Sequence, residues 1–372
     1  MRDNSKKIVS FPHIGNLYVP MQVLFRQLDI EYVVPPFCNG RGMAWGSKYS
    51  PEFVCIPYKQ VLGNYLEAVE MGANVLILLG GPGNCRFGYY SILQRKVFAE
   101  LGHDVELLTP IISSRTISGV TDILKHMSPR NPSTWECVQA VFLALSVLHD
   151  IDEIERKLQW VRAREITIGS ADKAFEKIAQ RMSRVSGLAE LKRVKKESLQ
   201  QLDDLPIDRK LEPLRVNVVG EIYVVHEPYV NKNLEVELGK RRVEVTRAEQ
   251  LSQWIVLSPA LVLDALGLGH EARIARAAHG YLDHLHGETI GQTVMASRQN
   301  FDGVVHLAPF VCTPEIVNEN ILPRLRQDVD IPVLSLILDE HTAEAGLLVR
   351  VEAFVDLLER RRRTRGGVPA RR

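Results

Sequence analysis

Short apolar runs alternate with segments of helical periodicity along the first third of the chain. Four apolar runs have the length of strands: 7–12, 31–35, 73–80 and 104–110. Apolar residues recur at helical spacing in three segments between or before these runs: 18–28, 57–71 and 89–101. The Pro- and Gly-rich stretch 35–54 predicts a loop. This strand–helix alternation predicts a parallel, doubly wound sheet.

A second series with the same alternation begins at residue 214. Its strand-like runs are 214–225, 241–246, 302–310 and 331–339, and its helical segments are 231–238, 248–299, 314–325 and 342–362. We therefore predict an α/β protein with two doubly wound, Rossmann-like parallel-sheet domains. The predicted divisions are an N-terminal domain, a helical region, a C-terminal domain and a disordered, solvated basic tail: 1–125, 126–212, 213–362 and 363–372.

Composition narrows the class of partner. The chain has 372 residues, 45% of them hydrophobic and 24% charged, with a formal net charge of +1. This balance is typical of a globular protein and gives no overall field that would favour nucleic acid or an anionic membrane. The N-terminal residues lack the apolar stretch of a signal peptide, and no run of about 18 apolar residues occurs. We expect a cytoplasmic protein without nucleic-acid or membrane partners.

The five cysteines carry the candidate chemistry. Their odd number, without a secretion signal, argues against a disulfide framework. The phrase F-V-C-x-P occurs twice, around Cys55 and Cys312, and Cys85 ends the glycine-rich turn G-G-P-G-N-C. These three are predicted at loop-to-helix or strand-to-helix junctions, where backbone N–H groups stabilise a thiolate. They indicate either a metal site or buried inert thiols, and inert burial is the interpretation for Cys38 and Cys137.

Other motifs give weaker signals. The sequence has no C-x-x-C pair, no phosphate-loop spacing and no G-x-G-x-x-G after a strand. Three histidines could suggest zinc but lack the spacing of a zinc helix, and exposed helix positions explain them equally: His279, His284 and His286. Arg86 and Lys59 follow two of the cysteines. They could offset the charge of a cluster or bind an anionic substrate, or they could be solvated surface residues.

At these motifs the chain resembles the D-component family of 2-hydroxyacyl-CoA dehydratases, which includes benzoyl-CoA reductase subunits and double-cubane cluster proteins. The similarity is greatest to stand-alone members associated with a CoA-enzyme activase. It spans most of the chain and rests on six motifs in this order: C-I-P-Y-K (55–59), G-G-P-G-N-C-R-F-G-Y-Y (80–90), V-G-E-I-Y (219–223), D-G-V-V-H-L-A-P-F-V-C-T-P-E (302–315), I-P-V-L-S-L-I-L-D-E (331–340) and R-V-E-A-F-V-D-L-L (350–358).

The resemblance implies that Cys55, Cys85 and Cys312 hold one [4Fe–4S] cluster through three of its irons. The fourth iron would stay open to water, hydroxide or a substrate oxygen, and no protein side chain is assigned a catalytic role. A separate ATP-hydrolysing activator with its own cluster would supply one electron at low potential. In true dehydratases of anaerobic metabolism, that electron drives loss of the hydroxyl group from an acyl-CoA thioester.

Three interpretations stay open. The first is a subunit of a hydro-lyase or reductase that acts on an acyl-CoA. The second is an electron-transfer or accessory protein that binds the cluster without turning over an acyl-CoA, and Cys38 as a fourth ligand would suit that role. The third is a cluster-free α/β binding protein with buried thiols. The chain could work as a monomer, as a homodimer or beside a related subunit.

Overall fold

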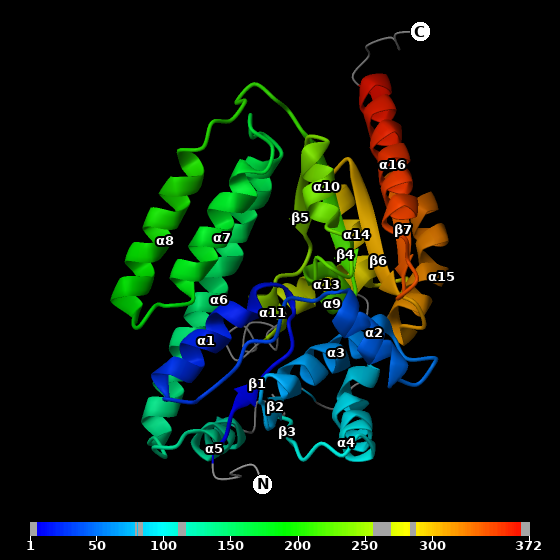
Figure 1. Ribbon diagram of the computed structural model, residues 1–372. Coiled ribbons are helices and arrows are strands. Elements are labelled where there is room, and N and C mark those ends of the chain that lie inside the picture. The colour runs from blue at the N-terminus through cyan, green and yellow to red at the C-terminus, as the bar shows by residue number, and fades with distance from the viewer. Residues whose placement is uncertain are drawn as a thin grey trace. The chain divides into compact units, whose positions relative to one another are not determined.

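The fold is α/β with two parallel sheets, as the sequence predicts (Figure 1). The computed structural model describes these residues: 6–78, 80, 85–110, 117–255, 269–282 and 288–365. Its contacts divide the chain into two compact units, each described here by itself. Unit 1 is Met1–Asp152 with Ile178–Glu197, and unit 2 is Glu153–Lys177 with Ser198–Arg372. The residues of the predicted helical region, 126–212, are therefore shared between the units.

The sheet of unit 1 has three described strands, all parallel, in the order β1-β2-β3: β1 (Val9–Ser10), β2 (Val75–Ile77) and β3 (Glu106–Leu108). The predicted strand 31–35 is reduced to a single bridge between Val9 and Tyr32. Two prolines at its end explain this difference, since proline has no N–H to donate to a ladder. The bridge lies on one side of β1, and β2 lies on the other side. The strand order therefore reverses at β1, which puts a topological switch point at its carboxyl end.

Helices surround this sheet and carry the loops of the candidate site. Their bounds are α1 (Tyr18–Gln27), α2 (Gly40–Lys48), α3 (Ile56–Glu70), α4 (Tyr90–Glu100), α5 (Ile117–Met127), α6 (Thr134–Arg162) and α8 (Leu188–Asp203), with short 3₁₀ turns η1 (Gly15–Leu17) and η2 (Arg86–Tyr89). Helices α6 and α8 each continue into unit 2. The prediction of a loop over 35–54 is wrong where α2 lies. Its N-cap is Asn39, whose Oδ1 accepts a hydrogen bond from the Gly42 N–H at 3.0 Å.

The glycines that suggested a loop instead allow α2 and α3 to pack closely. A Cβ built on Gly46 would lie 1.7 Å from the Lys59 carbonyl oxygen, and one on Gly63 would lie 2.0 Å from the Gly42 carbonyl oxygen. We expect Gly46→Ala to lower the free energy of unfolding by about 1–3 kcal/mol, because the helices must separate. Urea unfolding measures this. Gly187→Ala is the control, since its Cβ would contact nothing within 4 Å.

The sheet of unit 2 has four parallel strands in the order β5-β4-β6-β7: β4 (Leu214–Gly220), β5 (Val243–Arg247), β6 (Gly303–Pro309) and β7 (Val333–Leu338). Because β5 and β6 flank β4, the topological switch point lies between β4 and β6. Gly220 ends β4 opposite Leu307 with a φ of 129°, and a Cβ there would lie 2.0 Å from the Leu307 carbonyl oxygen. Only glycine fits this approach.

Buried side chains of β4, of β6 and of several helices of this unit form two hydrophobic clusters. The bounds of the helices are α7 (Ser170–Met182), α9 (Ile222–His226), α10 (Leu234–Lys240), α11 (Leu251–Trp254), α13 (His270–Ala278), α14 (Glu288–Arg298), α15 (Thr313–Asp328) and α16 (Glu344–Arg365). The predicted helical stretch 248–299 is thus divided into shorter helices. Residues 363–365 of the predicted tail continue α16, and 366–372 lie outside the described residues.

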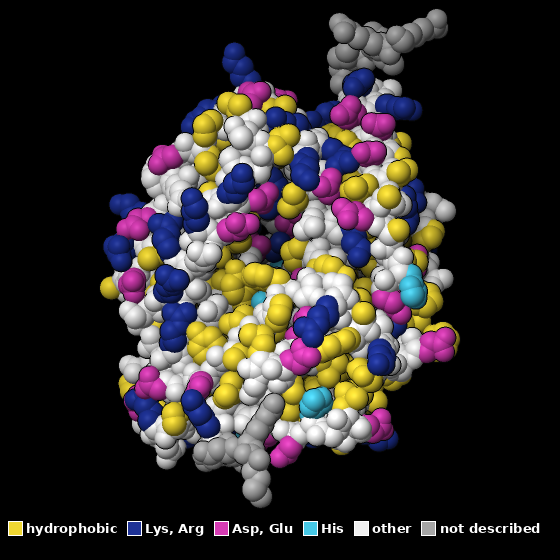
Figure 2. Space-filling model, viewed as in Figure 1, with side chains coloured by type: hydrophobic (Ala, Val, Ile, Leu, Met, Phe, Trp, Pro, Cys, Tyr) yellow, Lys and Arg dark blue, Asp and Glu magenta, His cyan; other side chains and the backbone are white. Residues whose placement is uncertain are grey.

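The surface carries charges of both signs. Acidic and basic side chains are interspersed over the face shown in Figure 2, in keeping with the net charge of +1. Among the described helices, none combines the length and the apolar composition needed to cross a bilayer.

Candidate cysteine site

All three predicted cysteines cap the N-terminus of a helical segment. Cys55 precedes α3 with φ −67° and ψ 152°, and Cys312 precedes α15 with φ −74° and ψ 113°. Cys85 precedes η2 with φ −83° and ψ 136°. A proline follows two residues after both Cys55 and Cys312, where its missing N–H costs no hydrogen bond. The repeated F-V-C-x-P therefore gives the same local structure twice, with a thiol beside the unpaired N–H groups of a first turn.

Unit 1 brings the loops of Cys55 and Cys85 together. The Tyr90 hydroxyl lies 2.8 Å from the Cys55 Sγ, and the Arg86 guanidinium donates a hydrogen bond to the Phe53 carbonyl oxygen at 2.8 Å. The Cys85 Sγ accepts a hydrogen bond from the Phe87 N–H at 3.4 Å. Two residues that follow Cys85 thus contact Cys55 or its loop, so the two cysteine loops pack against each other.

Cys312 belongs to unit 2. It follows β6 and is 4% exposed, and the preceding Val311 has a φ of 59°, an uncommon conformation for a β-branched residue. The left-handed turn places the cysteine at the entrance to α15. That Cys312 completes a site with Cys55 and Cys85 remains a prediction, since it lies in a different unit.

The other two cysteines have buried positions. Cys137 is 0% exposed within the hydrophobic core of unit 1, and burial raises the pKa of its thiol. Cys38 is 7% exposed, and its thiol donates a hydrogen bond to the Asn64 Oδ1 at 3.5 Å. A neutral thiol in a hydrogen bond to an amide oxygen suits the structural interpretation of Cys38 better than the ligand interpretation, since a ligand would be a thiolate.

His13 was not identified from the sequence, although it lies near Cys38. The backbone N–H of His13 donates a hydrogen bond to the same Asn64 Oδ1 at 3.2 Å, and the ring Nε2 lies 2.8 Å from the Pro35 carbonyl oxygen. Burial lowers the pKa of His13, so the ring is neutral with Nε2 protonated. Its Nδ1 has no hydrogen-bond partner among the described residues. The signal was available: F-P-H-I-G directly follows the first strand.

Arg86 and Lys59 have different surroundings. Arg86 is partly buried and joins the two cysteine loops, as described above. Lys59 is 4% exposed, and its Nζ lies 3.5 Å from the Glu52 carbonyl oxygen. The solvated-surface interpretation is therefore wrong for Lys59. A buried cation one turn into α3 from Cys55 would favour negative charge on sulfur.

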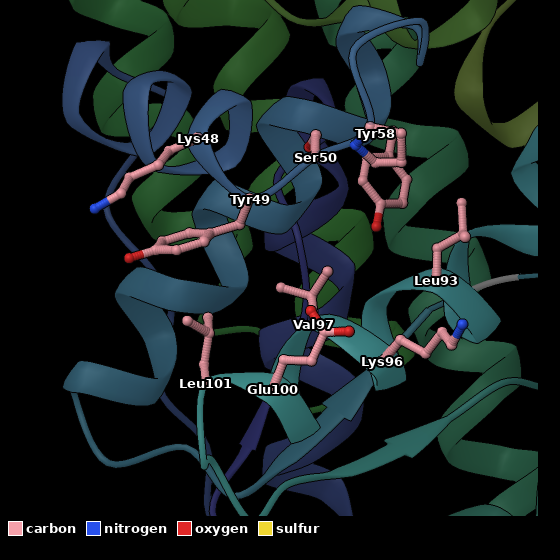
Figure 3. Close-up of a pocket in the computed structure, with 10 residues that line it drawn as sticks. Lys48, Tyr49, Ser50, Tyr58, Leu93, Lys96, Val97, Glu100 and Leu101 are labelled. Atoms are coloured by element: carbon pink, nitrogen blue, oxygen red, sulfur yellow. The ribbon is translucent and has the colours of Figure 1, made fainter.

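A pocket of about 380 Å³ lies next to this site in unit 1 (Figure 3). The Tyr58 side chain lines it, and its ring packs edge-on against Tyr90 with the centroids 4.9 Å apart. Burial raises the pKa of Tyr58 to about 12, so its hydroxyl keeps its proton. Leu93, Val97 and Leu101 of the α4 segment form an apolar wall. Tyr58 and Tyr90 connect this pocket to Cys55, since Tyr58 packs on Tyr90 and the Tyr90 hydroxyl lies 2.8 Å from the Cys55 Sγ.

Unit 2 carries a polar group at its switch point that sequence reasoning also missed, in which Glu315 is buried and Glu221 is partly exposed. Glu221 directly follows β4, and Glu315 lies in the first turn of α15. The Glu315 carboxylate accepts hydrogen bonds from His306 at 2.7 Å, Thr289 at 3.1 Å and Asn318 at 3.2 Å. The acidic residues in the motifs V-G-E-I-Y and C-T-P-E could have indicated this group, because Glu221 lies within one predicted strand-like run and Glu315 follows another.

Two other groups of side chains could be considered as metal sites, one on α6 and one among the histidines of 279–286, and the structure gives little support to either. The ligand atoms of His149, Asp150 and Glu153 lie within 4.8 Å of one another on α6. Asp150 is already paired with Lys195 at 2.8 Å, and clustered carboxylates without an ion are common. Of the histidines considered for zinc, His279 is exposed at the end of α13, and the other two lie outside the described residues.

The fold and the candidate site thus define an α/β protein with parallel sheets in two units and with three cysteines at the N-caps of helical segments. Comparison with known protein families gives no match, and comparison with curated proteins gives none either.

Proposed function

We propose that the chain binds a [4Fe–4S] cluster through Cys55, Cys85 and Cys312 and that it is a dehydratase- or reductase-type subunit. Its electron would come from a separate ATP-hydrolysing activator, and its substrate would be an acyl-CoA thioester. The observation that carries the proposal is the common position of the three cysteines as N-caps. Thiolates are the usual ligands of such clusters, and N–H groups near sulfur tune their potential.

The surroundings of the thiols fit an anionic group. Phe87 directs its N–H at the Cys85 sulfur, and Arg86 and the buried Lys59 place positive charge near the cysteine loops. The Tyr90 hydroxyl can donate to the Cys55 thiolate. When bound, the cluster would supply one-electron chemistry and an open coordination position. The protein would hold it by three thiolates, enclose it with aromatic rings and orient its substrate.

An assay of a panel of 2-hydroxyacyl-CoA thioesters tests the enzymatic part of this proposal. The activator, ATP and a reductant are supplied under anaerobic conditions. We expect dehydration that depends on all three additions and is lost in Cys312→Ala. The same substitution at Cys137 is the control, because that thiol lies in the hydrophobic core.

The alternative function is that of an electron carrier or accessory protein with the same cluster. Cys38 lies in unit 1 with two of the proposed ligands, and a fourth thiolate would close the cluster. Electron uptake from the activator without turnover of any thioester in the panel would favour this alternative. Loss of electron uptake in Cys38→Ala would then identify Cys38 as the fourth ligand.

A further inference from the structure

The pocket drawn in Figure 3 is formed by three segments of unit 1. The end of α2 with the turn that follows it (48–51), the first turn of α3 and one face of α4 enclose a volume of about 380 Å³. Because all three segments belong to one compact unit, the pocket exists within that unit alone. Pockets of this size with apolar walls and a few polar groups are typical small-molecule sites.

The α4 segment supplies the apolar wall of the pocket. Leu93, Val97 and Leu101 recur at intervals of four residues, so their side chains lie on one face of the helix. Lys96 and Glu100 each follow one of these residues by three positions and therefore lie along the edge of the same face. The wall offers a continuous apolar stripe to the body of a ligand and charged groups at its margin.

Tyr58 presents a buried hydroxyl that lacks a hydrogen-bond partner among the described residues. Its side chain is 0% exposed, and its ring is held edge-on against Tyr90. In Figure 3 the hydroxyl points toward the α4 side chains that line the pocket. Most buried polar atoms in proteins are paired, since an unpaired one loses its hydrogen bonds to water on folding. A ligand in the pocket would supply the missing acceptor.

The charged side chains of the lining favour an anion. They are two lysines and one glutamate: Lys48, Lys96 and Glu100. In Figure 3 the Lys48 side chain points away from Tyr58, whereas Lys96 belongs to the α4 wall that the Tyr58 hydroxyl faces. The ammonium group of Lys96 and the hydroxyl of Tyr58 both donate hydrogen bonds. A carboxylate only accepts them, so it is the group that matches this pair.

We propose that this pocket binds a small amphipathic carboxylate, with an aliphatic or aromatic body and one acid group. The carboxylate accepts a hydrogen bond from Tyr58 and pairs with Lys96, and its apolar body lies along the stripe of α4. Since Tyr58 is covered in the free protein, side chains of the wall change rotamer to admit the acid group, as is common on binding. The site requires no cluster and goes beyond the proposed function.

Isothermal titration calorimetry of the full-length, cluster-free chain with octanoate and 4-phenylbutyrate tests the site. Wild type should bind one molecule of either acid. Tyr58→Phe should bind about tenfold more weakly or worse, because it loses a hydrogen bond to a charged group. Lys96→Gln should bind more weakly and lose part of the salt dependence of the affinity. Lys192→Gln, at an exposed position of α8, is the control and should bind as wild type does.

Urea unfolding separates a binding role of Tyr58 from a structural one. In the free protein, Tyr58→Phe removes an unpaired buried hydroxyl and keeps the ring on Tyr90, so the unfolding midpoint should stay the same or rise. Octanoate should raise the midpoint of wild type and raise that of the variant less. A free variant that unfolds at lower urea, with an unchanged shift on addition of octanoate, would show that the hydroxyl is structural and would overturn its role in binding.

Two further comparisons locate the ligand and define its class. Val97→Trp fills the pocket from the α4 wall and should abolish binding of octanoate. Octanamide, which has the same apolar body without the charge, should bind wild type more weakly than octanoate and should be insensitive to Lys96→Gln. Failure of wild type to bind either acid, or equal binding of octanoate to wild type and Val97→Trp, overturns the site. Equal affinity for octanoate and octanamide overturns the carboxylate. Because cluster-free protein is used, these results do not depend on the proposed function.

Discussion

Anaerobically reconstituted Cys55→Ala, Cys85→Ala and Cys312→Ala are each expected to lose the [4Fe–4S] cluster. Wild type should hold about four irons and four sulfides per chain, and each variant less than about one. The reason is that a cluster with one open iron already has only three protein ligands, so no thiolate is dispensable. Iron and sulfide analysis with EPR of the reduced protein measures the loss.

The two remaining cysteines provide matched controls. Cys137→Ala removes a thiol from the hydrophobic core, and Cys38→Ala removes one that is hydrogen-bonded to Asn64. Both variants should keep full iron content. If Cys312→Ala alone retained the cluster, the ligands would lie within unit 1, and the three-cysteine proposal would be wrong. If wild type failed to bind iron, the interpretation as a cluster-free protein with buried thiols would stand.

The alternation of apolar runs was enough to predict the class of fold, because buried parallel strands need continuous apolar stretches. The run 73–80 became β2, and the run 302–310 became β6. The loop prediction failed at α2 because glycine there serves helix packing rather than a turn. Gly46 has a helical neighbour, and a single sequence gives no information about what lies opposite a glycine.

Only the part of the candidate site that depends on local sequence could be predicted. Local sequence determines an N-cap, so the repeated F-V-C-x-P could indicate the positions of Cys55 and Cys312. The polar groups beyond the strands depend on tertiary contacts. Glu221 and Glu315 are 94 residues apart in sequence, the difference between their numbers, and His306 reaches Glu315 only because β6 and α15 pack together. Periodicity cannot show such a relation.

A second buried network in unit 2 has a structural role. Arg247 ends β5, is 8% exposed and contacts Glu155 at 2.9 Å, Glu235 on α10, and the Nδ1 of His226 at 3.1 Å. Burial alone would lower the pKa of Arg247, but the two carboxylates outweigh it and raise the pKa. A second arginine, Arg162, lies 3.5 Å from Glu235. The network ties the last turns of α6 to the sheet.

Replacing Arg247 with methionine is expected to lower the free energy of unfolding by about 3–5 kcal/mol. The substitution keeps an apolar stem but leaves the carboxylates of Glu155 and Glu235 buried without their main counter-charge, and removal of one partner from a buried ion pair has this effect. Urea unfolding near pH 7 measures it. In the control Arg193→Met, an exposed pair with Glu197 is lost, and we expect a change below about 1 kcal/mol.

Neutralising Glu155 and Glu235 as well separates the effect of the unpaired carboxylates on stability from the effect of the lost arginine packing. In Arg247→Met combined with Glu155→Gln and Glu235→Gln, no buried carboxylate remains unpaired, so we expect much of the stability to return. Acidification should give the same result in the single variant: at a pH where both glutamates are protonated, Arg247→Met should differ less from wild type. A single variant that stays equally destabilised in both tests would show that Arg247 acts through its packing and not through its charge.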